Sequence, residues 1–113
     1  MNVAGKIWGK TSQIEANSSF ELHRIEVIGG HRCSKHRHLH KFNGFFVEAG
    51  TLEVTVWKED SGTVDKTVLT GGDYMAVAPG EYHQFKALED TTAFEVYWVE
   101  LSHNDIDRET FGQ

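Results

Sequence analysis

The stretch that decides the fold class is Gly44-Phe45-Phe46-Val47-Glu48-Ala49-Gly50-Thr51-Leu52-Glu53-Val54-Thr55-Val56-Trp57. Two runs of strand-forming residues flank Gly50, a residue type that favours turns. In the second run every other residue is apolar, so Leu52, Val54 and Val56 share one face of a strand. This strict alternation predicts a β-strand that is buried on one side.

Strand signals continue on both sides of this stretch. Residues 20–28 form a run of strand-forming residues that stops at a pair of glycines, and residues 58–63 are polar and predict a hairpin. The other strands predicted from the pattern lie at residues 66–69, 74–77, 83–87 and 93–101. About eight short strands with turns between them indicate an all-β sandwich or barrel, and the jelly roll is the version that holds a site in its mouth.

The composition predicts a single domain and limits the kinds of molecule that the chain is expected to bind. The 113 residues are 39% apolar and carry a net charge of −6, which predicts one core and disfavours nucleic acid and anionic membranes as partners. The first residues lack an apolar targeting segment and no apolar run is long enough to span a bilayer, so we expect a cytoplasmic protein. Cys33 is the single cysteine, which excludes an intramolecular disulfide, and we expect it to be a half-buried bystander.

Three histidines alternate in the run His36-Arg37-His38-Leu39-His40, and His83 follows later in the chain. If this run is extended, the three histidines point to the same side. A transition metal needs neutral nitrogens that converge from a rigid backbone, so the pattern predicts a metal site. The alternative is a basic patch for phosphate or nucleic acid, but alternation places its cations on the opposite face; these are Lys35, Arg37 and Lys41.

Two spaced motifs in this chain resemble the two motifs of the cupin family. They are Gly30-x5-His36-x-His38-x4-Asn43-x6-Gly50 and Gly72-x5-Ala78-x-Gly80-x2-His83. The resemblance implies a cupin double-stranded β-helix, a jelly-roll barrel that binds a divalent transition metal (Zn, Mn, Fe, Ni or Co) through His36, His38 and His83. Asn43 stands where the family has a Glu ligand, and an amide oxygen is a weaker, neutral ligand. His40 is either a fourth ligand or a hydrogen-bonding group in the pocket.

Three short landmarks are similar to the cupin domain of type II mannose-6-phosphate isomerases. They are Lys6-Ile7-Trp8-Gly9, Ser34-x-His36-x-His38-x-His40-Lys41-x-Asn43 and Asp105-Ile106-Asp107-Arg108. Where those isomerases have Gln-x-His-x-His-Arg-x-Glu, this chain has His36 for Gln, Lys41 for Arg and Asn43 for Glu. The resemblance implies one cupin domain over residues 1–113, with an N-terminal arm at about 1–15, a barrel at about 16–101 and a tail at about 102–113, and it implies a homodimer.

The same resemblance implies a phosphorylated sugar in the barrel mouth. A divalent ion would stabilise the enediolate formed when a base removes a proton between two sugar oxygens. His40 is the candidate base, because an imidazole transfers protons near neutral pH. Lys41 and Arg108 are candidates for holding the phosphate, although for Arg108 we favour an ion pair with an acid of the tail.

Two other functions remain open from the sequence. The chain can be a cupin that binds a ligand or assembles without catalysis, because a fold does not determine a function. It can also be a dioxygenase that holds ferrous iron on three histidines and leaves positions open for oxygen. A basic mouth would favour a sugar phosphate, whereas iron in an apolar mouth would favour an oxygenase.

Overall fold

The computed structural model describes residues 1–101, 105 and 107–110, and in these residues the chain forms nine β-strands and no helix. Accordingly, the described part contains no helix long and apolar enough to cross a membrane. The all-β prediction is confirmed. The strands are β1 (Asn2–Lys6), β2 (Gly9–Ala16), β3 (Phe20–Val27), β4 (Phe42–Ala49), β5 (Thr51–Lys58), β6 (Thr63–Thr70), β7 (Tyr74–Val77), β8 (Tyr82–Ala87) and β9 (Thr91–Trp98).

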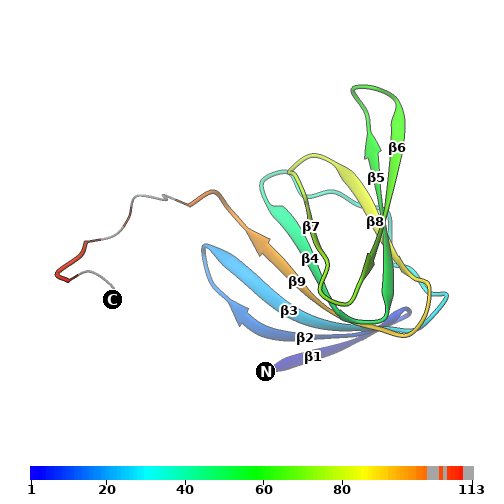
Figure 1. Cartoon of the computed structure of the whole chain (residues 1–113), viewed down its shortest axis with the longest axis horizontal. Helices are drawn as coiled ribbons and strands as arrows, with labels where there is room; N and C mark the ends of the chain where they lie inside the picture. The colour runs from blue at the N-terminus through cyan, green and yellow to red at the C-terminus, as the bar shows by residue number, and fades with distance from the viewer. Residues whose placement is uncertain (102–104, 106, 111–113) are drawn as a thin grey trace.

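The strands form two antiparallel sheets that face each other (Figure 1). The larger sheet has six strands in the order β1-β2-β3-β9-β4-β7, and the smaller has three in the order β6-β5-β8. From β4 onward the chain crosses between the sheets, since β4, β7 and β9 belong to the larger sheet and β5, β6 and β8 to the smaller. This winding is the predicted jelly roll, in which inward-facing side chains of both sheets form one core.

Two predicted elements have different boundaries in the structure. Residues of the predicted N-terminal arm form the hairpin of β1 and β2, which joins the edge of the larger sheet by pairing β2 with β3. The strand predicted at 93–101 is β9, which begins at Thr91 and ends at Trp98 because its partners Phe20 of β3 and Phe42 of β4 lie at the ends of those strands.

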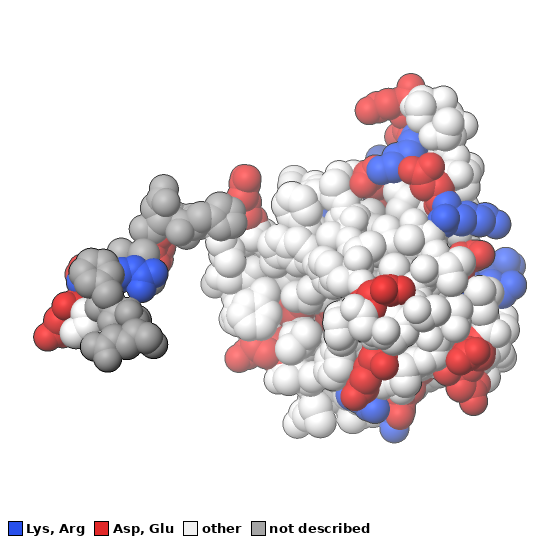
Figure 2. Space-filling view, in the orientation of Figure 1, with Lys and Arg blue, Asp and Glu red and all other residues white. Residues whose placement is uncertain are grey.

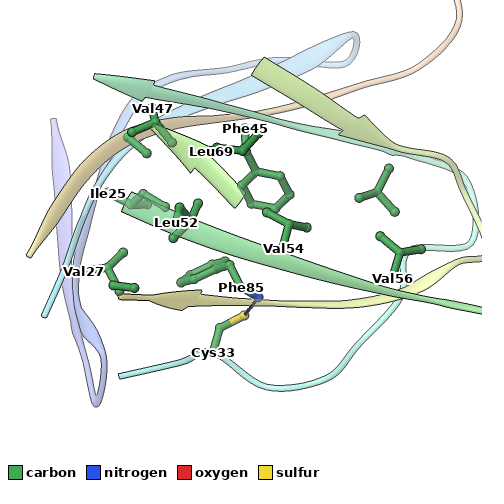
Figure 3. Close-up of a cluster of buried hydrophobic side chains, with 13 residues drawn as sticks. Ile25, Val27, Cys33, Phe45, Val47, Leu52, Val54, Val56, Leu69 and Phe85 are labelled. Atoms are coloured by element: carbon green, nitrogen blue, oxygen red, sulfur yellow. Dashed lines mark hydrogen bonds between the residues drawn. The ribbon is translucent and has the colours of Figure 1, made fainter. Parts of the chain in front are cut away.

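The core lies between the two sheets, as Figure 3 shows. The alternation seen in the sequence is the reason, because Leu52 and Val54 of β5 are fully buried and Val56 is 4% exposed. From the opposite sheet, Phe45 of β4 is also fully buried, and its ring lies 5.9 Å from that of Phe85 on β8. The half-buried strand predicted from residues 51–57 is confirmed.

Cys33 belongs to this core and is only 8% exposed, so the expectation of a half-buried thiol is wrong. Its Sγ accepts a hydrogen bond from the backbone N–H of Phe85 at 3.2 Å, drawn as a dashed line in Figure 3. Burial raises the pKa of the Cys33 thiol to about 11. The thiol is therefore protonated near neutral pH and acts as a small apolar side chain.

The turn between β4 and β5 requires glycine at position 50. Gly50 has a φ of +98°, and a Cβ there would lie 2.4 Å from the carbonyl oxygen of Asp90. Both the backbone angle and the close approach exclude a larger residue. This turn carries the chain from the larger sheet to the smaller, so Gly50 determines where the core strand β5 begins.

Candidate metal centre

The histidine run lies against β8 rather than in a strand of its own. Backbone bonds join His36 N to His83 O at 3.1 Å, His83 N to His36 O at 2.8 Å and Gly80 N to His38 O at 2.7 Å. The chain then bends at Leu39 and His40. The condition that the whole run is extended is therefore met only as far as His38, because the chain bends before it enters β4 at Phe42.

The imidazoles of His36, His38 and His83 converge into one cluster. Their nitrogen atoms lie within 4.8 Å of one another, one nitrogen from each ring. The ring centroids are 4.6 Å apart for His36 and His83 and 5.6 Å apart for His38 and His83. Residues separated by more than forty positions in the chain are thus held together by the isolated bridge between His36 and His83.

Backbone carbonyls orient two of these rings. The Nδ1–H of His36 donates to Ser34 O at 2.8 Å, and the Nδ1–H of His83 donates to Glu81 O at 3.0 Å. Because a carbonyl oxygen only accepts, each of these nitrogens carries the proton of a neutral ring, and Nε2 keeps a lone pair. The Nε2 of His38 is buried and has no hydrogen-bond partner among the residues that the structure describes. A buried polar atom without a partner costs about 1–3 kcal/mol, which a bound metal ion would remove.

Asn43 brings an oxygen to the same cluster. Its side chain is 1% exposed, and its Nδ2 donates to Glu95 Oε2 and to Val96 O, each at 3.4 Å. The amide oxygen consequently faces His83, with Asn43 Oδ1 3.0 Å from His83 Nε2. In a neutral ring whose proton is on Nδ1, these two atoms are both acceptors, so a cation between them is the natural partner. Two ligands at about 2.1 Å from one ion and at right angles lie about 3 Å apart. The donor set fits a divalent transition metal.

Burial keeps the imidazoles of His38 and His83 uncharged near neutral pH. Desolvation, followed by the neighbouring imidazoles of His36 and His83, lowers the pKa of His38 to about 4. Desolvation also lowers the pKa of His83, although the hydrogen bond to Glu81 O opposes it. Metal ligands must be neutral imidazoles, so these two rings are ready to bind an ion near neutral pH.

The depressed pKa of His38 makes the metal-free protein sensitive to acid. The ordinary pKa of His is 6.5, so between pH 6.5 and about 4 the unfolded chain binds a proton at His38 that the folded protein excludes. The free energy of unfolding is therefore expected to fall as the pH drops through this window. Urea unfolding in a chelator at pH 7 and pH 5 measures it. His38→Gln should flatten the dependence and His40→Gln should not; equal slopes in both variants would contradict the assignment.

A cavity of about 990 Å³ opens beside the cluster. His36 and His38 line it together with three cationic residues, Lys6, Arg32 and Lys41, and two acids, Glu21 and Glu95. Aromatic rings of Trp8, Phe85 and Tyr97 form part of its wall. On the face of the molecule in Figure 2, acidic side chains are scattered and reach the middle, whereas lysine and arginine side chains lie mainly toward the edges. The cavity is thus a mixed pocket with more positive than negative side chains.

The structure places the other predicted site residues at different distances from this cavity. Lys41 lines it, with Nζ 5.2 Å from the centre of the Tyr97 ring. His40 is exposed, lies outside the three-imidazole cluster and is not among the residues that line the cavity. Arg108 is exposed in the tail and does not line it either.

Most residues of the cavity wall were not predicted from the sequence, and three of them are polar side chains from two neighbouring strands. Glu95 and Tyr97 of β9 and His23 of β3 all face the cavity. The alternation of β9 carried a signal for the first two, because Glu95 and Tyr97 share the face of the buried Ala93. A charged residue on the inward face of a strand indicates a site rather than a core.

The fold is a jelly roll, and three imidazoles converge at its mouth. These two features are typical of metal-binding β-barrels. Residues 23–100 of this chain match the family described as the cupin domain. The chain therefore belongs to the cupin family, and the cupin double-stranded β-helix predicted from the two motifs is confirmed. Among curated proteins, none matches this chain.

Solved structures with the same fold are distant in sequence. KdgF from Halomonas sp. has a TM-score of 0.75 and 16% identity, over 89% of this chain and 90% of that one. The cupin domain of Cnp3 from Schizosaccharomyces pombe has a TM-score of 0.71 and 18% identity, over 88% and 69%. Oxalate decarboxylase from Bacillus subtilis, which has Mn(II) centers, reaches 0.78 at 17% identity, over 92% of this chain but only 29% of its own. At these identities the likeness shows the fold alone.

Proposed function

We propose that this cupin binds a divalent transition metal through His36, His38, His83 and Asn43 and isomerises a phosphorylated sugar in the adjacent cavity. The observation that carries the metal site is the 3.0 Å contact between Asn43 Oδ1 and His83 Nε2, two acceptor atoms in a buried place. The unpartnered Nε2 of His38 supports the same conclusion. The family includes metal-binding members such as the decarboxylase with Mn(II) centers.

The charge of the cavity favours an anionic substrate. Lys6, Arg32 and Lys41 come from three separate segments and all line the cavity. A phosphate dianion is held best by such permanent charges in a partly enclosed pocket, and an arginine can bind it with two hydrogen bonds. The three cations of the lining outnumber its two acids, Glu21 and Glu95, which favours a sugar phosphate over an apolar oxygenase substrate.

A bound divalent ion would supply a Lewis acid that polarises a carbonyl oxygen. The chain must then supply a group that moves a proton. His23 lines the cavity, with its Nε2 3.4 Å from Glu21 Oε2 and its Nδ1 3.4 Å from Thr11 Oγ1. A carboxylate that orients an imidazole is a common arrangement for proton transfer. His23 therefore replaces the exposed His40 as the proposed proton carrier.

Lys41→Gln is expected to weaken binding of a phosphorylated sugar about tenfold, because one charge-assisted hydrogen bond is lost. Calorimetry with mannose 6-phosphate and the metal-loaded protein measures the change. Lys66→Gln is the matched control, because Lys66 is exposed on β6 and does not line this cavity. Equal affinities for mannose and mannose 6-phosphate in the wild type would argue against a phosphate subsite.

The reaction itself is tested by following mannose 6-phosphate and fructose 6-phosphate by NMR with each candidate metal. Interconversion that a chelator stops supports the isomerase. Bound metal without turnover would indicate a ligand-binding cupin. Oxygen uptake with iron, and with none of the other metals, would indicate a three-histidine oxygenase. The proposed ligand set contains no carboxylate, which is compatible with such an oxygenase.

Two further features stay predictions: the cytoplasmic location, and the division of the chain into an arm, a barrel and a tail.

A homodimer is also part of this proposal. All five residues of β1 are exposed, and β1 is the edge of the larger sheet. An exposed edge strand can pair with the same strand of a second copy. In a dimer with twofold symmetry, this pairing covers β1 of both copies at once. Sedimentation equilibrium of the full chain tests it, and a monomer at all concentrations would refute it.

A further inference from the structure

Glu95 is the single acidic residue that is buried in the described part of the chain, and it is 7% exposed. Within that part no lysine, arginine or histidine forms an ion pair with it. Burying a carboxylate without a cation is costly unless hydrogen bonds or a metal compensate. Hydrogen bonds from neighbouring groups must therefore offset the cost of burying Glu95.

Strand pairing places Glu95 next to Asn43. Asn43 of β4 is opposite Tyr97 of β9, and Glu95 precedes Tyr97 by two residues on the same face of β9. Side chains in this diagonal relation reach each other across an antiparallel pair. Glu95 Oε2 accepts a hydrogen bond from Asn43 Nδ2 at 3.4 Å. Burial raises the pKa of the Glu95 carboxyl, and the neighbouring side chains of Tyr97 and Asn43 oppose this rise.

The direction of the bond between Asn43 and Glu95 matters for a metal ion. An amide side chain has two orientations, and only one presents its oxygen to the cluster. Glu95 Oε2 and Val96 O both accept from Asn43 Nδ2, so turning the amide over would set Asn43 Oδ1 against two acceptors. The two acceptors therefore keep the amide oxygen on the side of His83 Nε2.

We propose that Glu95 is a positioning residue for the metal: it holds Asn43 so that Oδ1 is the fourth ligand beside His36, His38 and His83. This inference rests on the metal site proposed above. This role of Glu95 also explains how an amide can act as a metal ligand here. The acceptor behind Asn43 disfavours the orientation in which the amide would direct its NH2 group toward the metal. Groups that orient metal ligands in this way typically change metal affinity about 10- to 100-fold when they are replaced.

The test exchanges the two kinds of side chain between positions 43 and 95. In Glu95→Gln, the new amide can donate as well as accept, so only Val96 O still opposes turning over of the Asn43 amide. We expect Co²⁺ affinity, measured by calorimetry, to fall about 10- to 100-fold and the visible spectrum of bound Co²⁺ to change. In Asn43→Asp combined with Glu95→Gln, position 43 has oxygens on both sides and the amide introduced at position 95 donates to one of them, so Co²⁺ affinity should recover.

Glu48→Gln is the matched control, because Glu48 lies on β4 with Asn43 but is exposed. It should bind Co²⁺ as the wild type does. Circular dichroism and thermal unfolding of each metal-free variant show whether it is folded. A purely structural role for Glu95 would lower stability without recovery of Co²⁺ binding in the double variant.

Three outcomes overturn the proposal, and they are distinguishable. If folded Glu95→Gln binds Co²⁺ as tightly as the wild type, Glu95 does not position a ligand. If the double variant stays as weak as Glu95→Gln, the orientation of the group at position 43 is not the cause. If wild-type protein binds Co²⁺ no better than His38→Ala, the metal site itself is refuted, and the role of Glu95 with it.

Discussion

Replacement of His38 by alanine is expected to abolish stoichiometric metal binding. In the described part of the chain, the buried Nε2 of His38 has no hydrogen-bond partner, and a ring nitrogen of His38 lies within 4.8 Å of one in His36 and one in His83. Loss of a direct ligand should exceed the roughly 10- to 100-fold effect of losing a group that only orients one. Elemental analysis of protein purified without a poly-histidine tag should give one transition metal per chain for the wild type and none for the variant.

His40→Ala is the matched control for this experiment. His40 lies two residues beyond His38 in the same run, but it is exposed and outside the cluster. The variant should keep one metal per chain, because the bend at Leu39 and His40 turns the chain away from β8. Metal that is lost from His40→Ala and kept in His38→Ala would refute the ligand set drawn from the geometry.

Phe45→Ala is expected to reduce the free energy of unfolding by about 3–5 kcal/mol, the usual cost of truncating a buried phenylalanine. Phe45 is fully buried between the sheets, with its ring 5.9 Å from that of Phe85 and 6.3 Å from that of His83. The substitution removes apolar contacts and leaves a void that the rigid strands cannot close. The same void lies beside His83, so metal affinity should fall as well.

Urea unfolding of the metal-free protein measures this loss, and Phe46→Ala is its control. Phe46 is the next residue of β4, but it is 41% exposed and points to the other face of the sheet. Its truncation should cost about 1 kcal/mol or less. Similar losses for the two variants would mean that the core does not depend on the alternation of β4.

Most of the strands could be predicted because their signal is local. The alternation of Leu52, Val54 and Val56 depends on a period of two that any half-buried strand repeats, and all three are buried in the structure. The turn at Gly50 could be predicted in the same way, since glycine alone accepts its positive φ without strain. The family could also be predicted, because its motifs are spacings within short segments.

The histidine run shows where local pattern fails. Alternation predicts that His36, His38 and His40 share a face, but this holds only while the chain stays extended. The bond from Gly80 N to His38 O is the last between this run and the turn before β8, and the chain bends directly after it. The exclusion of His40 is a consequence of where the next strand must begin.

Most strands, the jelly roll and the three candidate histidines could be predicted from the amino-acid pattern, because each depends on residue types at short, regular spacings. The three-dimensional arrangement was needed to show that Asn43 faces His83, that Glu95 lies behind Asn43 and that Lys6, Arg32 and Lys41 share one cavity. These contacts join segments far apart in the chain. Their formation depends on the register of β4 with β9 and on the packing of two sheets, which no local pattern encodes.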